Sequence, residues 1–269
     1  MATFENWGDY FWPGQIDDCL INRLGIHDAD TLKDEERLRS AERGTELIAG
    51  DVEIPQTFDL DHLRAIHRQL FQDVYDWAGE LRATELVRPS KDPDAPGHEF
   101  VKPEDLERLA PVLFAQLGDP AELRDRPTAE VVDVLARTYA GVNVLHPFVE
   151  GNGRTQRIFL DHAAEAAGYR IDWTRIADRQ NEIMSEAFGV GPEPVRAALT
   201  ECIEPLGGDD DQARQDTQHA LRLTTSGLAT PSGSAPSGLP APTGSAPATS
   251  QAPAAHRYTS PTRTQPERQ

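Results

Sequence analysis

The chain has 269 residues, a formal net charge of −19 at pH 7 and 38% hydrophobic residues. So negative a balance argues against binding to a nucleic-acid backbone, and no apolar stretch approaches the ~20 residues needed to cross a bilayer. The two cysteines, Cys19 and Cys202, cannot form a disulfide framework. The amino-terminal residues have no basic region followed by an apolar one, as a secretion signal would. We therefore expect a cytoplasmic protein that binds neither nucleic acid nor membrane.

The first half of the chain is predicted to be mostly helical. Residues 28–49 are polar and have no helix breaker before Gly44; their leucines are Leu32, Leu38 and Leu47. Asp59 can cap a second helix that extends to about Tyr75. Its apolar residues recur at the i, i+3, i+7, i+8 spacing of one buried face, namely Leu63, Ile66, Leu70 and Phe71. Pro103 stands at the start of a third helix. That helix has one apolar side, made of Leu106, Leu109, Val112, Leu113 and Leu117.

The second half continues the helical pattern. Residues 129–144 are strongly apolar and are predicted to form the central helix. Residues 152–167 form the next helix, which ends before Gly168, a typical residue after a helix. Two further helices are expected near 173–188 and 192–202, and an acidic segment opens a last short helix that reaches about Leu223.

The segment between Gly79 and Val101 gives the only strand signal. Residues 81–87 show partial alternation of apolar and polar side chains, and residues 99–101 follow a loop rich in Pro, Asp and Gly. This pattern predicts a β-hairpin, with an unpaired surface loop as the alternative. The last residues, 224–269, are rich in Ser, Thr, Ala, Pro and Gly, so we expect them to be a disordered tail, either a linker or a delivery signal.

One segment concentrates the residues that carry chemistry. Residues 146–157 read HPFVEGNGRTQR, which supplies a histidine, a carboxylate, two glycines, an amide and two arginines. A triphosphate needs backbone N–H donors, guanidinium groups and a metal, whereas a hydroxyl nucleophile needs a base such as histidine. The segment also opens a helix that Asn152 or Thr155 can cap, and helix N-termini favour phosphate. Two arginines three residues apart on that helix are expected to point the same way.

This segment resembles the HPFx[D/E]GNGRxxR signature of Fic-domain proteins at every specified position. Residues 71–82 are similar to the family's segment before its substrate flap, and residues 10–14 and 22–26 resemble the N-terminus of Fic toxins and Fic-bearing effectors. The resemblance covers roughly Tyr10 to Trp173. It implies an all-α fold, a Fic helical bundle with a small β-hairpin flap. We expect an N-terminal helical segment over 1–50, the Fic core over 51–205, a short helix over 206–223 and the tail over 224–269.

The resemblance also implies a role for each residue in AMP transfer from ATP to a Ser, Thr or Tyr hydroxyl of a target protein. His146 would be the base, and Glu150 would bind Mg²⁺. The phosphates would be held by Gly151, Gly153, Arg154 and Arg157, while Asn152 would hold phosphate or the loop itself. The flap would bind the target by strand addition through Thr84, Glu85, Leu86, Val87 and Phe100.

Other activities remain open at this point. A Lys in place of Gly153 marks a phosphorylating branch of the wider family, so the glycine favours AMP transfer. Phosphocholine or UMP transfer stays possible, as does a catalytically silent Fic module that only binds nucleotide or a partner.

Regulation is expected to come from another protein. Many Fic proteins carry an inhibitory [S/T]xxxE[G/N] motif whose Glu pairs with the second arginine, here Arg157. The near matches at 31–36 and 200–205 both fail at the last position. We therefore expect a small antitoxin that supplies this Glu in trans. The resemblance to Fic toxins implies the ATPase subunit of a type II topoisomerase as a target. Delivery as a secreted effector is the alternative to a cytoplasmic toxin.

Overall fold

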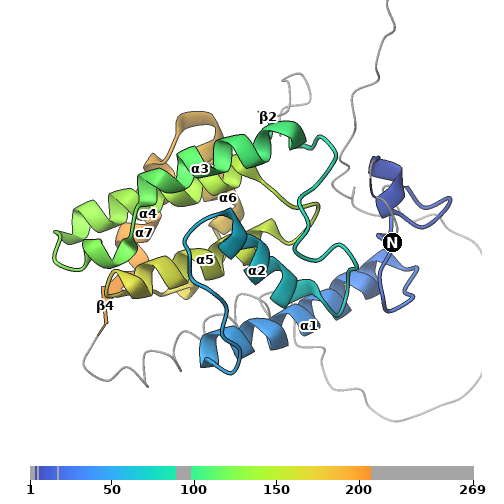
Figure 1. Ribbon diagram of the computed structural model, residues 1–269, viewed down its shortest axis with the longest axis horizontal. Coiled ribbons are helices and arrows are strands. Elements are labelled where there is room, and N and C mark those ends of the chain that lie inside the picture. Colours follow the sequence, from blue (N-terminus) through green and yellow to red (C-terminus); the bar gives the residue numbers. More distant parts are fainter. Residues whose placement is uncertain (1–3, 5, 17, 89–97, 207–269) are drawn as a thin grey trace, which may run out of the picture.

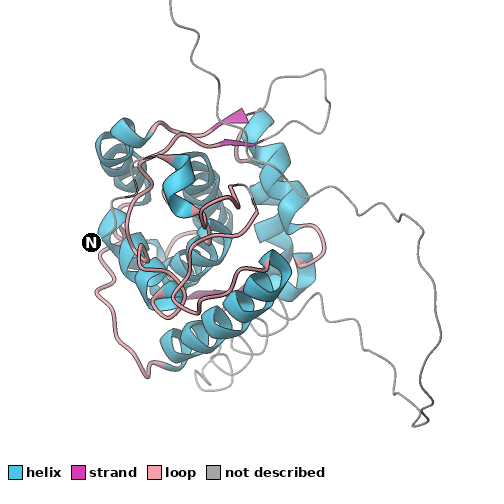
Figure 2. Ribbon diagram, turned by 90° about the vertical axis from the view of Figure 1, so that its right-hand side faces the viewer, coloured by secondary structure: helices cyan, strands magenta, loops and turns pink. Residues whose placement is uncertain are grey.

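The computed structural model describes residues 4, 6–16, 18–88 and 98–206. Within these residues the predicted all-α class is confirmed, because helices form most of the fold and the strands are two or three residues long (Figure 2). The predicted short helix near Leu223 and the predicted tail lie outside the described residues.

Helix α1 (Ala29–Ala49) lies along one edge of the molecule, packed on α2 (Leu60–Phe71) (Figure 1). It begins where Asp28 accepts a hydrogen bond from the Thr31 N–H at 2.8 Å, as a capping side chain does. Its buried positions follow the spacing of one helical face, and two of them are polar, Glu36 and Ser40. Leu38 is exposed, so the buried face of α1 is defined partly by polar side chains.

Helix α2 has the Asp59 cap that the sequence predicts, with the His62 N–H 3.0 Å from the Asp59 carboxylate. It ends at Phe71, four residues earlier than predicted. The reason lies in Tyr75 and Trp77, whose rings stack with centroids 4.2 Å apart. Residues i and i+2 of a helix do not face each other, so this stack requires the chain to leave the helix first.

The central helix is α4 (Thr128–Leu145), as predicted. It contacts α3 (Leu106–Leu117), α5 (Asn152–Ala166), α6 (Gln180–Val190) and α7 (Glu193–Cys202). Four short 3-10 helices connect these elements: η1 (Trp7–Tyr10), η2 (Pro103–Asp105), η3 (Pro120–Leu123) and η4 (Trp173–Ile176).

The apolar face predicted for α3 is partly wrong. Its buried residues are Leu106, Ala110, Phe114 and Leu117, a stripe at i, i+4, i+8 and i+11. Val112, expected inside, is 61% exposed, because it lies on the side of the helix away from α4.

The predicted hairpin is present but short. Strand β1 (Val87–Arg88) pairs antiparallel with β2 (His98–Glu99), with Val87 opposite Glu99. A second antiparallel pair, β3 (Tyr169–Ile171) with β4 (Ile203–Pro205), was not predicted. Three residues give too little alternation to be recognised, and the two strands lie more than thirty residues apart in the chain.

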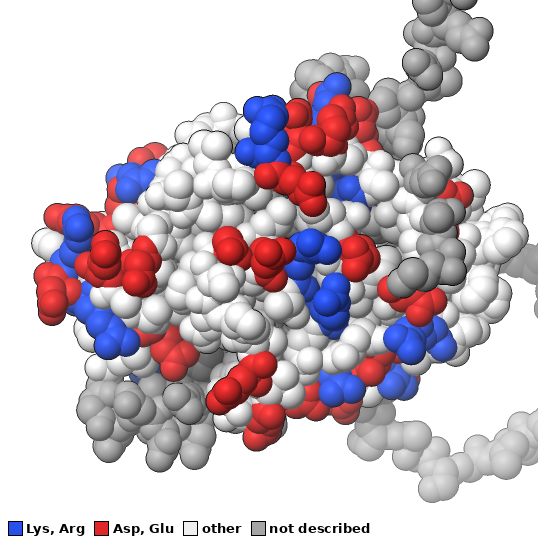
Figure 3. Space-filling view, viewed as in Figure 1, with Lys and Arg blue, Asp and Glu red and all other residues white. Residues whose placement is uncertain are grey.

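The charged side chains on the face in Figure 3 mix both signs, so that Lys and Arg lie beside Asp and Glu. Several ion pairs among the described residues join positions one helical turn apart, such as Arg39 with Glu35 and Arg126 with Glu130. Among the described helices, none combines the length and the apolar character that crossing a bilayer requires.

Candidate functional site

The predicted base, His146, lies directly after the last residue of α4 and has a left-handed backbone with φ of 44°. Its N–H still donates to the Val142 carbonyl at 2.9 Å, so it closes the helix. A left-handed conformation is uncommon for a residue with a Cβ, and such strain concentrates at functional sites. Within the described residues only Phe58 shares this property among the non-glycine residues.

The hydrogen bonds of Arg82 hold this strained turn in place. Its Nε donates to the His146 carbonyl at 2.8 Å and its Nη1 to the Thr84 carbonyl at 2.8 Å, while Nη2 donates to the Val101 carbonyl. Its backbone N–H donates to Pro147 O at 2.9 Å. The side chain is 2% exposed, and burial lowers its pKa to about 10. One guanidinium thus ties both arms of the hairpin to the turn that carries His146.

The hairpin contributes Phe100 to the site directly. The Phe100 ring stacks on the His146 imidazole, with centroids 3.9 Å apart and planes 17° apart. Thr84 and Leu86 are buried beside it, whereas Glu85 is exposed and pairs with Lys102 at 3.9 Å. The predicted flap therefore lies beside the predicted base, with its alternate side chains facing inward.

The loop between α4 and α5 is held by its own amide side chain. Asn152 accepts a hydrogen bond from the Phe148 N–H at 3.0 Å and donates to the Phe148 carbonyl at 2.7 Å. The capping roles predicted for Asn152 and Thr155 are therefore wrong: Asn152 closes the loop, and the Thr155 hydroxyl donates to the Gly151 carbonyl at 3.0 Å. Helix α5 begins at Asn152, and its N-cap residue Gly151 provides no side-chain cap, which leaves the N–H groups of the first turn to a ligand.

Gly151 is required at its position for two reasons. Its φ is 79°, and a Cβ there would come within 2.3 Å of the Phe71 ring. The preceding carbonyl, that of Glu150, is 3.0 Å from His67 Nε2. Because the Gly79 N–H donates to His67 Nδ1 at 2.8 Å, the His67 proton resides on Nε2 and points to Glu150. Burial lowers the pKa of His67 to about 3, so this buried imidazole is neutral.

Glu150 is the one carboxylate of this loop, and its side chain is 46% exposed. Removal from bulk water and the negative charge of Glu36 raise its pKa. The described residues contain no group of three or more metal-ligating side chains. A single carboxylate fits Mg²⁺ when phosphate oxygens and water complete the six ligands, so the donor set suits a metal that arrives with a nucleotide.

Arg154 points toward α1. It donates to the Glu36 carboxylate and, through Nη1, to the Ser40 hydroxyl at 2.8 Å, and it lies 3.6 Å from the Glu150 carboxylate. Its guanidinium carbon is 4.7 Å from the centre of the Phe71 ring. Although burial lowers the pKa of Arg154, the charges of Glu36 and Glu150 raise it above its usual value.

Glu36 was not singled out from the sequence, although it ends the near match at 31–36. The glutamate that the inhibitory motif would use there is Glu35, and it pairs with Arg39 at 3.4 Å on the surface of α1. In the second near match Glu204 pairs with Arg170 at 2.6 Å. Neither of these two contacts Arg157.

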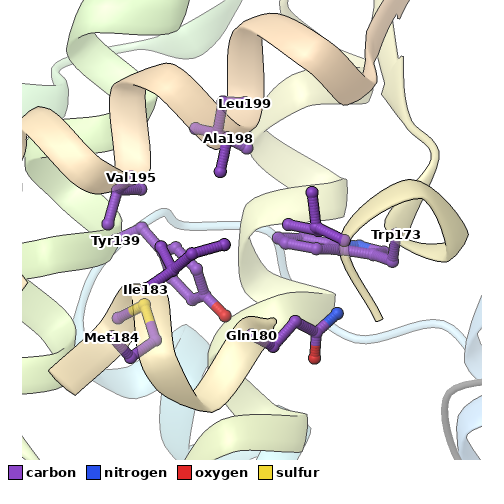
Figure 4. A pocket seen from close by; sticks show the side chains of 9 residues that line it. Tyr139, Trp173, Gln180, Ile183, Met184, Val195, Ala198 and Leu199 are labelled. Carbon is purple, nitrogen blue, oxygen red and sulfur yellow. The ribbon is translucent and has the colours of Figure 1, made fainter. Parts of the chain in front are cut away.

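Arg157 takes a different direction from Arg154, contrary to the expectation from their spacing. Its Nη1 donates to the Gln180 side chain of α6 at 3.2 Å. The same atom also lies near Gly153, 3.5 Å from the position that a Cβ of that residue would take. Burial lowers its pKa, and the neighbouring Tyr139 hydroxyl counteracts this shift. Gln180 and Tyr139 also line a small apolar pocket between α4, α6 and α7 (Figure 4). That pocket contains neither His146 nor Glu150, so it is not the site that the motif forms.

The similarity of this chain to known proteins includes the 146–157 segment. The Fic/DOC family model matches residues 57–164. Protein adenylyltransferase VbhT of Bartonella schoenbuchensis is 38% identical over 199 residues, 74% of this chain but 40% of that longer protein. Probable protein adenylyltransferase Fic of Escherichia coli is 37% identical over 173 residues, 64% of this chain and 80% of that protein. A solved N-terminal Fic domain of a VirB-translocated Bep effector from Bartonella quintana, with bound ADP, has a TM-score of 0.65 at 26% identity, covering 74% of this chain and 95% of that one.

Proposed function

This chain belongs to the Fic/DOC family, and on that premise we propose that it is a protein adenylyltransferase that transfers AMP from ATP to a Ser, Thr or Tyr hydroxyl of a target protein. Two relatives are named as enzymes of this class, and a structural relative binds ADP. The observation that carries the proposal is that three functional groups lie close together in the chain. The strained His146, the carboxylate of Glu150 and the uncapped start of α5 all lie on one short loop.

In this proposal His146 removes the proton from the target hydroxyl, whose oxygen then attacks the α-phosphate of ATP while pyrophosphate leaves. Phe100 packs against one face of the imidazole and so restricts its orientation. The carbonyl of His146 is held by Arg82 at 2.8 Å, so the base is placed by its backbone as well as by its ring. A general base of this kind contributes about 10²–10⁴-fold to the rate.

The phosphates are assigned to the start of α5. Backbone N–H groups near Gly151 and Gly153 would hold them, while Asn152 keeps the loop in shape through its two bonds to Phe148. Arg154 is assigned to the β- and γ-phosphates and Arg157 to the γ-phosphate. Glu150 would hold Mg²⁺, which supplies charge neutralisation between the α- and β-phosphates.

The target segment is assigned to the hairpin. Strand addition uses main-chain hydrogen bonds, and the Thr84 and Leu86 carbonyls are already bonded to Arg82 and to the Phe100 N–H, so the added strand is assigned to the main-chain groups of Glu85 and Val87. Phe100 connects this edge to His146. A hydroxyl on an added strand would thus be presented to the base.

We further propose that the protein is the toxin of a toxin–antitoxin pair in the cytoplasm. The two near matches of the inhibitory motif are engaged in surface ion pairs, which supports inhibition by a small antitoxin that supplies its Glu in trans. The ATPase subunit of a type II topoisomerase is proposed as the target class. The Fic core is assigned to 51–205 and residues 1–50 to its N-terminal helical segment.

The test uses purified protein in a bacterial lysate with Mg²⁺ and ATP labelled at the α-phosphate, beside the His146→Ala variant. A labelled protein band that disappears with His146→Ala supports AMP transfer. A band seen only with label at the γ-phosphate would instead establish phosphorylation. Labelling that is equal in both proteins would remove His146 from its proposed role.

A further inference from the structure

We propose that Glu36 of α1 is a positioning residue that sets Arg154 for the β- and γ-phosphates of ATP. The inference rests on the proposed function, because Arg154 has this task only if ATP is the substrate. It concerns a residue outside the 146–157 motif, 118 positions away in the sequence from the arginine that it contacts.

Both oxygens of the Glu36 carboxylate are engaged. Oε1 accepts a hydrogen bond from Arg154 Nη2, and Oε2 accepts one from the Tyr75 hydroxyl. The Glu36 residue is 6% exposed, and Tyr75 is 1% exposed with its ring stacked on Trp77. The Tyr75 hydroxyl, whose ring is held by its stack on Trp77, fixes one oxygen of this buried carboxylate, so the other oxygen offers Arg154 a fixed anchor.

Three groups around the Arg154 guanidinium restrict its rotamer. Ser40, one turn further along α1, accepts from Nη1 at 2.8 Å, and the Phe71 ring lies under the guanidinium plane at 4.7 Å. A guanidinium has five N–H donors, and the bonds to Glu36 and Ser40 use two of them. The anchored fork therefore keeps donors for phosphate oxygens while its direction is already set, which lowers the entropy lost on binding.

Glu36 also separates Arg154 from the metal carboxylate. Arg154 lies 3.6 Å from Glu150, a longer contact than its bonds to α1. Without the charge of Glu36, the nearest remaining carboxylate for Arg154 is that of Glu150. A direct pair between these two would turn the fork from the phosphates and occupy the oxygen assigned to Mg²⁺. The carboxylates of Glu36 and Glu150 thus keep the Arg154 guanidinium between them.

The test measures binding of Mg²⁺–ATP and of AMP by calorimetry, with His146→Ala as the parent protein so that no transfer occurs. Glu36→Gln removes the charge and keeps the shape. We expect ATP to bind about 10-fold more weakly and AMP within about 2-fold of the parent, because only ATP carries the phosphates that Arg154 holds. Glu35→Gln is the matched control, since it removes the same charge from the adjacent position of α1, where the side chain pairs with Arg39.

The ratio of AMP to ATP affinity separates positioning from mere support of the fold, because a general loosening would weaken both ligands. Tyr75→Phe provides a second variant should Glu36→Gln fold poorly: it removes one bond to Glu36, and we expect a loss of about 3-fold for ATP alone. Unchanged or tighter ATP binding by Glu36→Gln would overturn the inference, and tighter binding would make Glu36 a competitor of phosphate.

Arg154→Met distinguishes the two levels of the proposal. If this variant binds ATP as the parent does, Arg154 holds no phosphate, and both its role in the proposed function and the inference fail. If Arg154→Met weakens ATP binding while Glu36→Gln does not, the proposed function stands and the inference alone fails.

Discussion

The two sides of the candidate site are built with different chemistry. On the α1 side a partly buried arginine, Arg154, is bound to a buried carboxylate, Glu36. On the hairpin side a buried arginine, Arg82, is bound to backbone carbonyls only. The first arrangement places a charge that a phosphate can share, whereas the second uses a guanidinium as a rigid cross-link between chain segments. In the proposed function the same residue type therefore serves ligand binding on one side and loop geometry on the other.

The largest expected effect is on the hairpin side. Arg82→Ala leaves three or more buried carbonyls without their donor, so the free energy of unfolding should fall by about 3–5 kcal/mol. Chemical denaturation measures this loss. Arg68→Ala is the matched control, because Arg68 is exposed and pairs with Glu80 at 3.3 Å, and its removal should change stability by under about 1 kcal/mol. A loss below about 1 kcal/mol for Arg82→Ala would show that water replaces the guanidinium.

On the α1 side the expected loss can be reversed. Arg154→Met leaves Glu36 as a buried charge without its partner and should lower the free energy of unfolding by about 3 kcal/mol. Adding Glu36→Gln removes that charge while Tyr75 keeps an acceptor, so the double variant should recover most of the loss. The coupling energy from the double-mutant cycle is the measurement. Independent, additive losses would mean that the ion pair in the structure does not contribute to folding.

Protonation should loosen the hairpin side before the α1 side. Burial lowers the pKa of His67 to about 3, below its ordinary value of 6.5. The folded state therefore binds this proton less readily than the unfolded state, and the stability from neutral His67 is present above pH 6.5 and lost as the pH falls toward 3. At pH 5 the loss is about 2 kcal/mol for this residue. His67 joins Gly79 to Glu150, so amide exchange at Gly79 should increase first.

His62 and His162 add to the same trend, because burial lowers their pKa values to about 3 and about 4. Asp161 opposes this trend, because burial raises its pKa to about 8. The contribution of Asp161 to the free energy of unfolding therefore falls as the pH rises from 3.8 to 8. A free energy of unfolding that rises between pH 7 and pH 5 would show that the aspartate dominates and the histidines do not.

The sequence was most informative where a local rule governs the structure. Asp59 caps the helix it precedes, and the apolar run at 129–144 is the central helix, because caps and helical faces depend on neighbours within a few residues. The segment 146–157 was recognised from its motif, and the structure places His146 and Glu150 between α4 and α5 and Arg154 in the first turn of α5.

The parts that the sequence did not reveal depend on distant partners. Glu36 meets Arg154 across 118 positions, and Arg82 meets the His146 carbonyl across 64. Neither residue belongs to a sequence pattern that would identify it. A single polar residue is interpreted from the sequence as an ordinary surface residue, whether or not the fold buries it. Asn152 was expected to cap a helix, to hold phosphate or to hold the loop. It closes the loop, because a side-chain amide can satisfy both backbone groups of Phe148 at once.

The smallest expected effect belongs to Arg157. It tests whether Arg157 is a third arginine with a role of its own, different from those of Arg154 and Arg82. Arg157 donates to Gln180 and faces neither Glu36 nor the hairpin. Its neighbours are the Gln180 amide, the Tyr139 hydroxyl and the Asp161 carboxyl, whose pKa burial raises to about 8. The loss of Arg157 therefore leaves no buried anion at neutral pH, so Arg157→Ala should keep the melting temperature within about 2 °C of the parent. ATP binding should weaken about 5-fold and ADP binding should not change, because the residue is assigned to the γ-phosphate. Calorimetry with both nucleotides decides this. A variant that loses ADP binding equally would place Arg157 with Arg154, and one that melts far below the parent would make it a structural link to α6.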